Sequence, residues 1–160
     1  MVAFEHRRSA EDTLAILDVV ARYGFVVDDR DWEAFDRVFT EDAVFDPRDH
    51  GLEPPRGFAP LIGLEEIVRS FRDVYTHPLQ HMVVASVIDD VSPDEVVVRS
   101  KGVFPIPEFQ FFEGMYTDIL VRTEAGWRIR HKTFKRFGKG ATPWMRQVTR
   151  DAQAKGATLE

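Results

Sequence analysis

The chain has 160 residues, of which 44% are hydrophobic and 30% charged, so its composition is that of a globular protein and its length suits one domain. The 27 acidic and 21 basic residues give a formal net charge of -6, which leaves no broad positive field for a nucleic acid. The sequence contains no cysteine, which excludes disulfide bonds, thiolate nucleophiles and cysteine-ligated zinc.

Nothing in the sequence indicates export or membrane insertion. Residues 1–8 contain no apolar segment of the kind that a signal peptide has, and no later apolar run approaches the ~20 residues that span a bilayer. We therefore expect a cytoplasmic protein. One basic cluster has a spacing that puts most of its side chains on the outer face of a strand, so neither a nucleic acid nor a membrane is expected as a partner. This cluster consists of Arg128, Arg130, His131, Lys132, Lys135 and Arg136.

The first half of the chain has the periodicity of helices. Ser9 followed three residues later by Asp12 is typical of a capping box, and the residues behind it predict a helix over about 10–27. The stripe of this helix recurs at steps of three and four residues: Leu14, Leu17, Ala21 and Gly24. A short second helix is predicted over 31–39 and a short strand over 43–46.

A third helix is predicted over about 64–75, and after it the pattern changes from helix to strand. The apolar face of this helix consists of Leu64, Ile67, Val68, Phe71 and Val74. Four later runs are rich in Val, Ile, Phe and Tyr and are separated by short turn-like segments, which predicts antiparallel strands. These strands lie near 80–89, 95–105, 109–123 and 126–137. Helices followed by such a meander predict an α+β fold in which the helices cover one face of the sheet.

The chain is predicted to form one domain over 1–160, because no repeat or linker divides it. Its core is expected over about 10–137. Thr142 and Pro143 predict the start of a short last helix, because proline is favoured at the first helical position. The residues from about Ala154 onward are expected to form a loose tail.

Several conspicuous patterns do not indicate a site. His77 and His81 are four residues apart, as two zinc ligands on a helix would be, but Pro78 between them excludes that helix. The sequence has no G-x-S-x-G, P-loop or G-x-G-x-x-G pattern, so we expect neither a metal nor a nucleotide cofactor. Two prolines interrupt segment 104–107 beside the aromatic segment 109–112, which is typical of an edge or a bulge. These segments form either a pocket mouth or a dimer contact.

Asp28 is the first candidate for chemistry. It continues the stripe of the first helix, since a step of four residues from Gly24 returns to the same face. A carboxylate that points to the interior must be paired, be neutral or serve as a cap, because burying an unpaired charge is costly. The alternative interpretation is that Asp28 caps the second helix, with Asp31 three residues later.

His81 is the second candidate. Its strand alternation places it on one face with Val83, Ala85 and Val87, where an imidazole is either a core residue or a partner for Asp28. If Asp28 accepts the Nδ1 proton of His81, the tautomer is fixed and Nε2 is left free as a base. We expect the negative charge of Asp28 to raise the pKa of His81 by more than burial lowers it.

Alternation within the strands orients further side chains. In the second strand Arg99 and Lys101 are predicted to face outward. The residues predicted to face inward are Val98, Ser100, Gly102 and Phe104. His131 shares the alternation of Trp127 and Ile129, so it is the reserve candidate for an inward base.

Four segments in order resemble the SnoaL-like group of the nuclear-transport-factor-like superfamily. They are Tyr23 to Trp32, Phe39 to Ala43, His81 at the start of a strand, and Gly126 to Ile129. The resemblance covers roughly 10–137. It implies a cone formed by helices and a curved antiparallel sheet around an apolar cavity, often in a homodimer or higher homo-oligomer. Scytalone dehydratase, bile-acid 7α-dehydratase and lindane dehydrochlorinase are similar in having an aspartate and a histidine at the positions of Asp28 and His81.

Two positions depart from scytalone dehydratase. Val27 stands where that enzyme has a tyrosine, and Ile106 stands opposite its second catalytic histidine. Tyr23 instead matches the tyrosine of bile-acid 7α-dehydratase. Five residues of a helix correspond to about 140° of rotation, so Tyr23 and Asp28 are not expected to touch. A core role and a catalytic role remain open for Tyr23.

The resemblance implies a cofactor-independent acid-base enzyme for a small hydrophobic organic substrate. The expected reaction is dehydration, in which His81 removes a proton, Asp28 orients His81, and Tyr23 or the imidazolium protonates the leaving oxygen. The residues predicted to contact the substrate are Phe104, Ile106, Phe112, Tyr116 and His131. One alternative is isomerisation or polyketide-type cyclisation with the same pair. Another is a non-catalytic binding or assembly subunit, because one fold hosts many functions.

Overall fold

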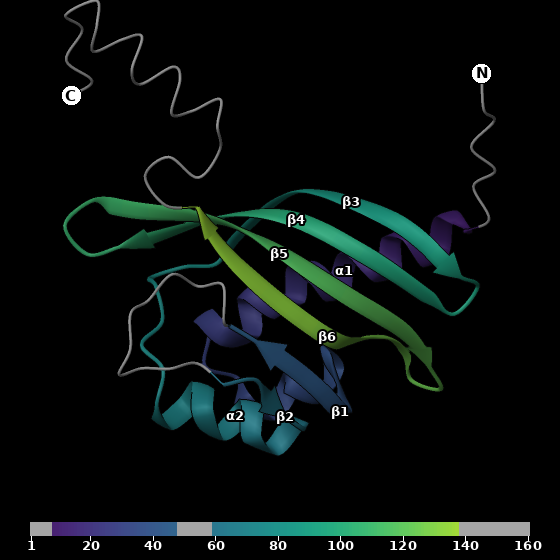
Figure 1. Ribbon diagram of the computed structural model, residues 1–160, viewed down its shortest axis with the longest axis horizontal. Coiled ribbons are helices and arrows are strands. Elements are labelled where there is room, and N and C mark those ends of the chain that lie inside the picture. The colour runs from purple at the N-terminus through teal and green to yellow at the C-terminus, as the bar shows by residue number, and fades with distance from the viewer. Residues whose placement is uncertain (1–7, 48–58, 138–160) are drawn as a thin grey trace, which may run out of the picture.

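The computed structural model of the chain describes residues 8–47 and 59–137 (Figure 1). Its helices and its six-stranded, mostly antiparallel sheet confirm the predicted α+β class. The helix predicted after Thr142 and the tail lie outside the described residues. The organisation of 1–160 as a single domain stays a prediction.

Helix α1, Ala10–Asp28, begins where the capping pattern predicts, and the Ser9 hydroxyl accepts the backbone N–H of Asp12 at 3.0 Å. Its buried face differs from the predicted stripe, since Leu14 is 70% exposed. The buried positions are Ile16, Val19, Val20, Tyr23, Gly24, Val26 and Val27. The bulky residues, which remove more apolar area from water, face the sheet, whereas Ala21 of the predicted stripe faces solvent.

After α1, the second helix is shorter than predicted and the first strand is longer. The second helix is a 3-10 helix, η1, Trp32–Arg37, and strand β1, Phe39–Asp46, begins four residues before the predicted start at Ala43. A short strand that was not predicted, β2, Leu61–Ile62, pairs with β1. The third helix, α2, Leu64–Asp73, ends before Val74, which is 71% exposed and not part of the buried face.

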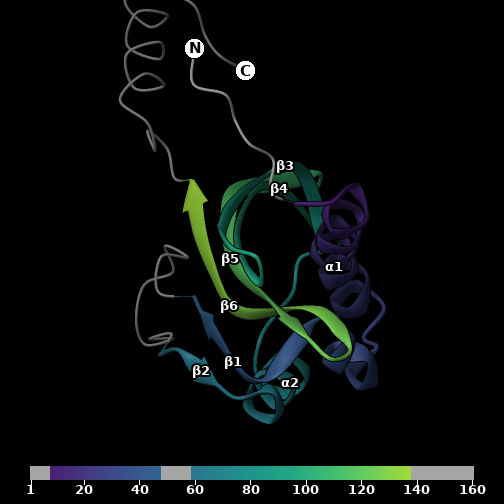
Figure 2. The same cartoon turned by 90° about the vertical axis from the view of Figure 1, so that its right-hand side faces the viewer.

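The four long strands confirm the predicted meander: β3, Met82–Ser92; β4, Glu95–Ile106; β5, Gln110–Thr123; and β6, Gly126–Phe137. The strand order in the sheet is β2-β1-β6-β5-β4-β3, and among these described strands β1 and β6 form the one parallel pair. Figure 2 shows the sheet curling round α1 without closing, with α2 beside β1 and β2. The interior of this curved sheet is where the inward side chains of β3 to β6 meet α1.

Alternation holds along β4 but changes phase in β3. In β4, Val98, Ser100, Gly102 and Phe104 are buried, whereas Arg99 and Lys101 are exposed, as predicted. In β3, Ala85 is an extra residue between the pairs Val84–Lys101 and Ser86–Ser100, and its φ is 51°. Such a bulge reverses the faces of the residues that follow it.

The prediction that Ala85 and Val87 face inward is therefore wrong. Ala85 is exposed and Val87 is 52% exposed. Ser86 points inward instead, because its hydroxyl lies 2.8 Å from that of the buried Ser100.

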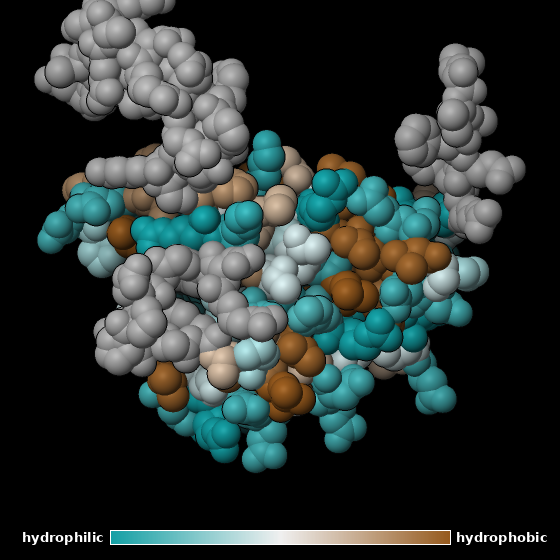
Figure 3. All heavy atoms as spheres, in the orientation of Figure 1, coloured by the Kyte–Doolittle hydropathy of each residue, from teal (hydrophilic) through white to brown (hydrophobic). Residues whose placement is uncertain are grey.

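The outer face of the sheet mixes charged and apolar side chains, as the spheres over the long strands show in Figure 3. Arg99 and Lys101 are exposed there, while Val97 and Ile119 are half-buried. Within residues 8–47 and 59–137, neither α-helix has the length and apolar character that would let it cross a membrane.

Candidate active site

Asp28 and His81 meet where the C-terminal end of α1 approaches the start of β3. The Oδ1 atom of Asp28 lies 2.6 Å from Nδ1 of His81, and Oδ2 accepts the backbone N–H of His81 at 2.8 Å. The His81 side chain is 6% exposed and that of Asp28 is 22% exposed. The expected contact is confirmed. The interpretation of Asp28 as the cap of the second helix is wrong, because Asp31 occupies the N-cap position of η1, with no side-chain cap hydrogen bond.

Gly24 allows this close approach. It lies one helical turn before Asp28, and a Cβ atom at this position would lie 2.8 Å from the backbone oxygen of His81. Real Cβ atoms do not come so close to another backbone, so a larger residue would push α1 away from His81. Glycine inside a helix is less favourable than alanine by about 1 kcal/mol. At this position it brings the carboxylate of Asp28 into contact with His81.

The hydrogen bond to Asp28 determines which His81 nitrogen carries the proton. A carboxylate only accepts, so Nδ1 of His81 is the donor and Nε2 of the neutral ring is unprotonated. Within the described ranges Nε2 makes no hydrogen bond. Nε2 is therefore the imidazole nitrogen that keeps a free lone pair.

The pKa of His81 shifts against expectation. Burial lowers it below the ordinary value of 6.5, and the hydrogen bond and charge of Asp28 oppose this shift without overcoming it. The positive charges on His77 and Lys132 add to the lowering. The predicted rise is wrong because an almost fully buried imidazolium loses more solvation than Asp28 restores. A lowered pKa favours the neutral ring, which is the state that a base requires.

Aromatic rings from three segments surround His81. Tyr23 of α1 and Phe104 of β4 make T-shaped contacts with it, at centroid distances of 5.8 and 5.6 Å. His77, in the loop before β3, lies 6.1 Å away, and its Nε2 lies 2.7 Å from the carbonyl oxygen of Phe71. Sequence patterns rejected His77 as a metal ligand and gave no other signal for its position beside His81. Burial lowers its pKa below 6.5 as well.

Tyr23 lies inside the protein, only 2% exposed, and its side chain hydrogen-bonds to Tyr116. Burial raises the pKa of both phenols far above 10. A phenol with such a pKa is a poor proton donor to a leaving group. Tyr23 therefore packs against His81 in a position that favours support of the ring over acid catalysis.

The residues predicted to contact a substrate divide into two groups. Phe104 and Tyr116 are 1% and 3% exposed and lie in the interior, where Phe112 stacks on Phe104 at 4.8 Å. Ile106 is half-buried at the end of β4 and lies beyond the last residue pair between β3 and β4, Met82–Val103. Contact of these four residues with a ligand stays a prediction.

His131 does not face the interior. Arg130 is an extra residue in β6, because Leu120 pairs with Ile129 and Ile119 pairs with His131. The bulge reverses the alternation, so Lys132 points inward and His131 points to the other face. The predictions of an inward His131 and of an outward Lys132 are both wrong for this reason.

Sequence patterns did not identify the buried ion pair that results. The Nζ atom of Lys132 lies 3.0 and 2.9 Å from the two carboxylate oxygens of Asp118 on β5, and the side chains are 1% and 0% exposed. Burial lowers the pKa of Lys132 and the attraction of Asp118 opposes this shift. Asp118 lies on the strict alternation of β5 between Tyr116 and Leu120, which was the one available signal.

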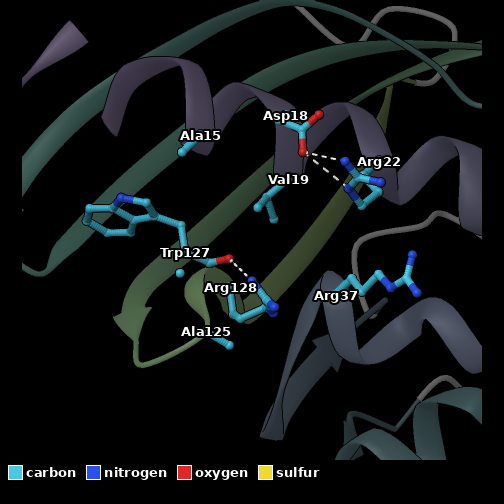
Figure 4. A pocket seen from close by; sticks show the side chains of 9 residues that line it. Ala15, Asp18, Val19, Arg22, Arg37, Ala125, Trp127 and Arg128 are labelled. Carbon is cyan, nitrogen blue, oxygen red and sulfur yellow. Dashed lines mark hydrogen bonds and ion pairs between the residues drawn. The ribbon is translucent and has the colours of Figure 1, made fainter. Parts of the chain in front are cut away.

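A separate groove of about 360 Å³ lies outside this site, between α1, η1 and the turn from β5 to β6 (Figure 4). Arg22, Arg37 and Arg128 border it. Arg22 is paired with Asp18 at 2.7 Å, and Arg128 donates to the carbonyl oxygens of Asp36 and Trp127. Neither Asp28 nor His81 lines this groove. In the described part of the chain, no three His, Asp or Glu side chains are grouped as ligands for a metal ion.

Known proteins resemble this chain in sequence and in fold. The family model of the SnoaL-like domain matches residues 8–133. An uncharacterized protein of Mycobacterium tuberculosis is 35% identical over 122 residues, which cover 74% of this chain and 80% of that protein.

Three solved structures share the fold. A proposed aromatic ring hydroxylase from Novosphingobium aromaticivorans has a TM-score of 0.67 and 28% identity, over 82% of this chain and 93% of its own. A proposed scytalone dehydratase from the same species has a TM-score of 0.62 and 19% identity, over 80% and 88% of the two chains. A hexachlorocyclohexane dehydrochlorinase from Novosphingobium barchaimii has a TM-score of 0.62 and 18% identity, over 80% and 90%.

Proposed function

Because the chain belongs to the family of SnoaL-like domains, we propose that it is a cofactor-independent lyase that removes water from a small apolar organic molecule, with His81 as the base. The observation that carries the proposal is the buried contact of Asp28 with Nδ1 of His81, which leaves Nε2 unprotonated. The proposed scytalone dehydratase and the dehydrochlorinase that share the fold are both named for eliminations.

The reaction needs one group that first accepts and then returns a proton. Nε2 of His81 removes the proton next to an electron-withdrawing group, such as a carbonyl, and the electron pair of that C–H bond forms a carbon–carbon double bond. The β C–O bond breaks, and its oxygen takes the proton from the imidazolium and leaves as water. Asp28 stabilises the imidazolium in between and keeps the ring in place.

The surroundings of His81 favour an apolar substrate. Tyr23 and Phe104 pack directly against the ring, and Phe112 stacks on Phe104. Aromatic rings offer large apolar contact area and few hydrogen bonds, so they select flat, hydrophobic molecules. A substrate with one polar reacting end and an apolar body would suit a site that combines the Asp28–His81 pair with these aromatic rings.

A direct test uses a panel of β-hydroxy ketones whose dehydration gives a conjugated enone that absorbs in the ultraviolet. We expect turnover by the wild type and its loss in His81→Gln and Asp28→Asn. His131→Gln, which changes a histidine of the other sheet face, is the matched control and should retain turnover. Full activity of folded His81→Gln would refute the proposal.

A second outcome keeps the same pair but not the elimination. If the substrate carbanion is reprotonated on carbon or attacks a second carbonyl, the reaction is isomerisation or cyclisation. Mass spectrometry identifies dehydration, which loses one water, whereas isomerisation and cyclisation both conserve mass. Proton NMR of the product separates these two, because cyclisation forms a new carbon–carbon bond that closes a ring. Exchange of a substrate C–H for deuterium without net reaction would indicate a base that works on another leaving group.

A non-catalytic binding or assembly subunit is the alternative of a different class, because one fold hosts many functions. Such a subunit requires a partner chain, whereas the proposed lyase works as a homo-oligomer. We propose a homodimer, and analytical ultracentrifugation of the purified chain tests it. A monomer that turns over no substrate until a partner protein is added would favour the subunit.

A further inference from the structure

We propose that Lys132 is a positioning residue of this site: its ammonium, held by Asp118 between the faces of Tyr23 and Tyr116, keeps Tyr23 against the His81 ring and opposes protonation of that ring. This inference rests on the proposed role of His81 as a base. It concerns the buried ion pair, which the proposed reaction itself does not use.

The location of the pair calls for a reason beyond stability. Lys132 and Asp118 face each other across β6 and β5, in the interior, with side chains that are 1% and 0% exposed. Two charges lose their hydration there, and a buried ion pair is often no more stabilising than apolar residues of the same volume. Perturbed charges of this kind gather at functional sites, although structural pairs also exist.

The ammonium makes two further contacts. Its Nζ atom lies 3.9 Å from the ring centroid of Tyr23 and 3.8 Å from that of Tyr116. Both distances are well within the range of a cation–π attraction, which is stronger when the groups are shielded from water. The Tyr23 ring is therefore held on one face by Lys132, while it makes a T-shaped contact with His81 at 5.8 Å. A continuous series of contacts runs from Asp118 through Lys132 and Tyr23 to His81.

The series gives Lys132 a role that complements that of Asp28. A carboxylate bonded to an imidazole favours the imidazolium, and a base that is already protonated removes no proton. The charged and titratable groups around His81 are Asp28 and Tyr23 on α1, His77 in the preceding loop and Lys132 on β6, with Tyr116 and Asp118 of β5 behind them. The charge of Lys132 lowers the pKa of His81, against that of Asp28. Asp28 thus fixes the tautomer, and Lys132 helps to keep the ring neutral.

The test measures His81 without any substrate. The double variant Asp118→Asn/Lys132→Gln removes both charges and retains two side chains that hydrogen-bond to each other. Nitrogen-15 NMR of the imidazoles, with His81 assigned by its loss in His81→Gln, gives its tautomer and its pKa. We expect the acid dissociation constant of His81 to fall by about threefold or more in the double variant, because the charge of Lys132 lowers the His81 pKa and Asp118 is not among the groups that shift it.

The matched control is the exposed ion pair of Asp89 and Arg99, which also joins two neighbouring strands, β3 and β4. The N–O distance is 2.9 Å and the side chains are 54% and 52% exposed. Asp89→Asn/Arg99→Gln should leave the His81 titration unchanged. A double variant of Asp118 and Lys132 that loses thermal stability but retains the wild-type His81 titration would overturn the proposal, since the pair would then be structural only.

Two further measurements keep the test decisive. If the double variant does not fold, the wild type still decides, because the proposal requires His81 to be neutral at pH 7 with its proton on Nδ1. A protonated His81 at that pH would refute it. Lys132→Arg, which keeps the positive charge, should leave the His81 pKa low. A shifted His81 pKa in a protein that turns over no β-hydroxy ketone would support the role of Lys132 and count against the proposed lyase alone.

Discussion

Replacing Asp28 by Asn removes the charge and keeps the size of a side chain that accepts two hydrogen bonds from one residue. The carboxylate contacts Nδ1 of His81 at 2.6 Å and accepts the backbone N–H at 2.8 Å. An amide has a single acceptor oxygen. If that oxygen remains on the backbone N–H, the NH2 group faces Nδ1 and moves the imidazole proton to Nε2. If the amide turns over, its NH2 group opposes the backbone N–H of His81.

The cost follows from these two contacts. A hydrogen bond to a charged group contributes about 1.5–3 kcal/mol. Because Asp28 is 22% exposed and the amide keeps one of the two bonds, we expect a loss of about 1–2 kcal/mol in the free energy of unfolding. Activity should fall much further, because the lone pair on Nε2 is lost. The same change in the serine protease triad lowers kcat by about 10⁴, and we expect roughly 10³ to 10⁴ here.

Three assays separate these effects. Nitrogen-15 NMR reports the His81 tautomer, urea unfolding reports stability, and the enone absorbance reports turnover. Asp29→Asn is the matched control, since it changes an exposed neighbouring carboxylate that is not in the site. An Asp28→Asn protein that keeps the proton on Nδ1 and turns over substrate like the wild type would refute the reasoning.

Three further changes have outcomes that follow from the structure. Gly24→Ala should destabilise the protein and weaken the Asp28–His81 contact in NMR spectra, although alanine favours a helix by about 1 kcal/mol, because the new Cβ meets the His81 backbone oxygen at 2.8 Å; an unchanged His81 spectrum would contradict this. Lys132→Met should lower the free energy of unfolding by about 3–5 kcal/mol, because Asp118 is left buried and unpaired. A smaller loss than in Asp118→Asn/Lys132→Gln would count against this prediction. His81 and His77 have pKa values below the 6.5 of the unfolded chain, so the unfolded state binds more protons below that pH. Unfolding titrations should show stability that is complete above about pH 6.5 and falls as the pH drops through the lowered values. The value of kcat/KM should rise with pH over the same window.

Local sequence patterns were sufficient to predict many of the secondary-structure elements and part of the interior. The Ser9 cap, the four long strands and the inward set of β4 follow from turn chemistry and from alternation with period two, which depend on neighbouring residues in the chain. The pairing of Asp28 with His81 was also predictable, because each is a polar group at an inward position and needs a partner. The position of Asp28 came from an imperfect stripe, since Leu14 of that stripe is exposed.

Only the tertiary structure decided which residues after each bulge face the interior. Ala85 and Arg130 are extra residues that exist because neighbouring strands pair in a curved sheet, and nothing in the sequence marks them. Each bulge reverses the faces of the residues that follow, which turns His131 out and brings Lys132 to Asp118. The sign of the His81 pKa shift was decided in the same way. Desolvation depends on how completely rings from α1, β4 and the preceding loop cover the imidazole, and that coverage is a property of the assembled fold.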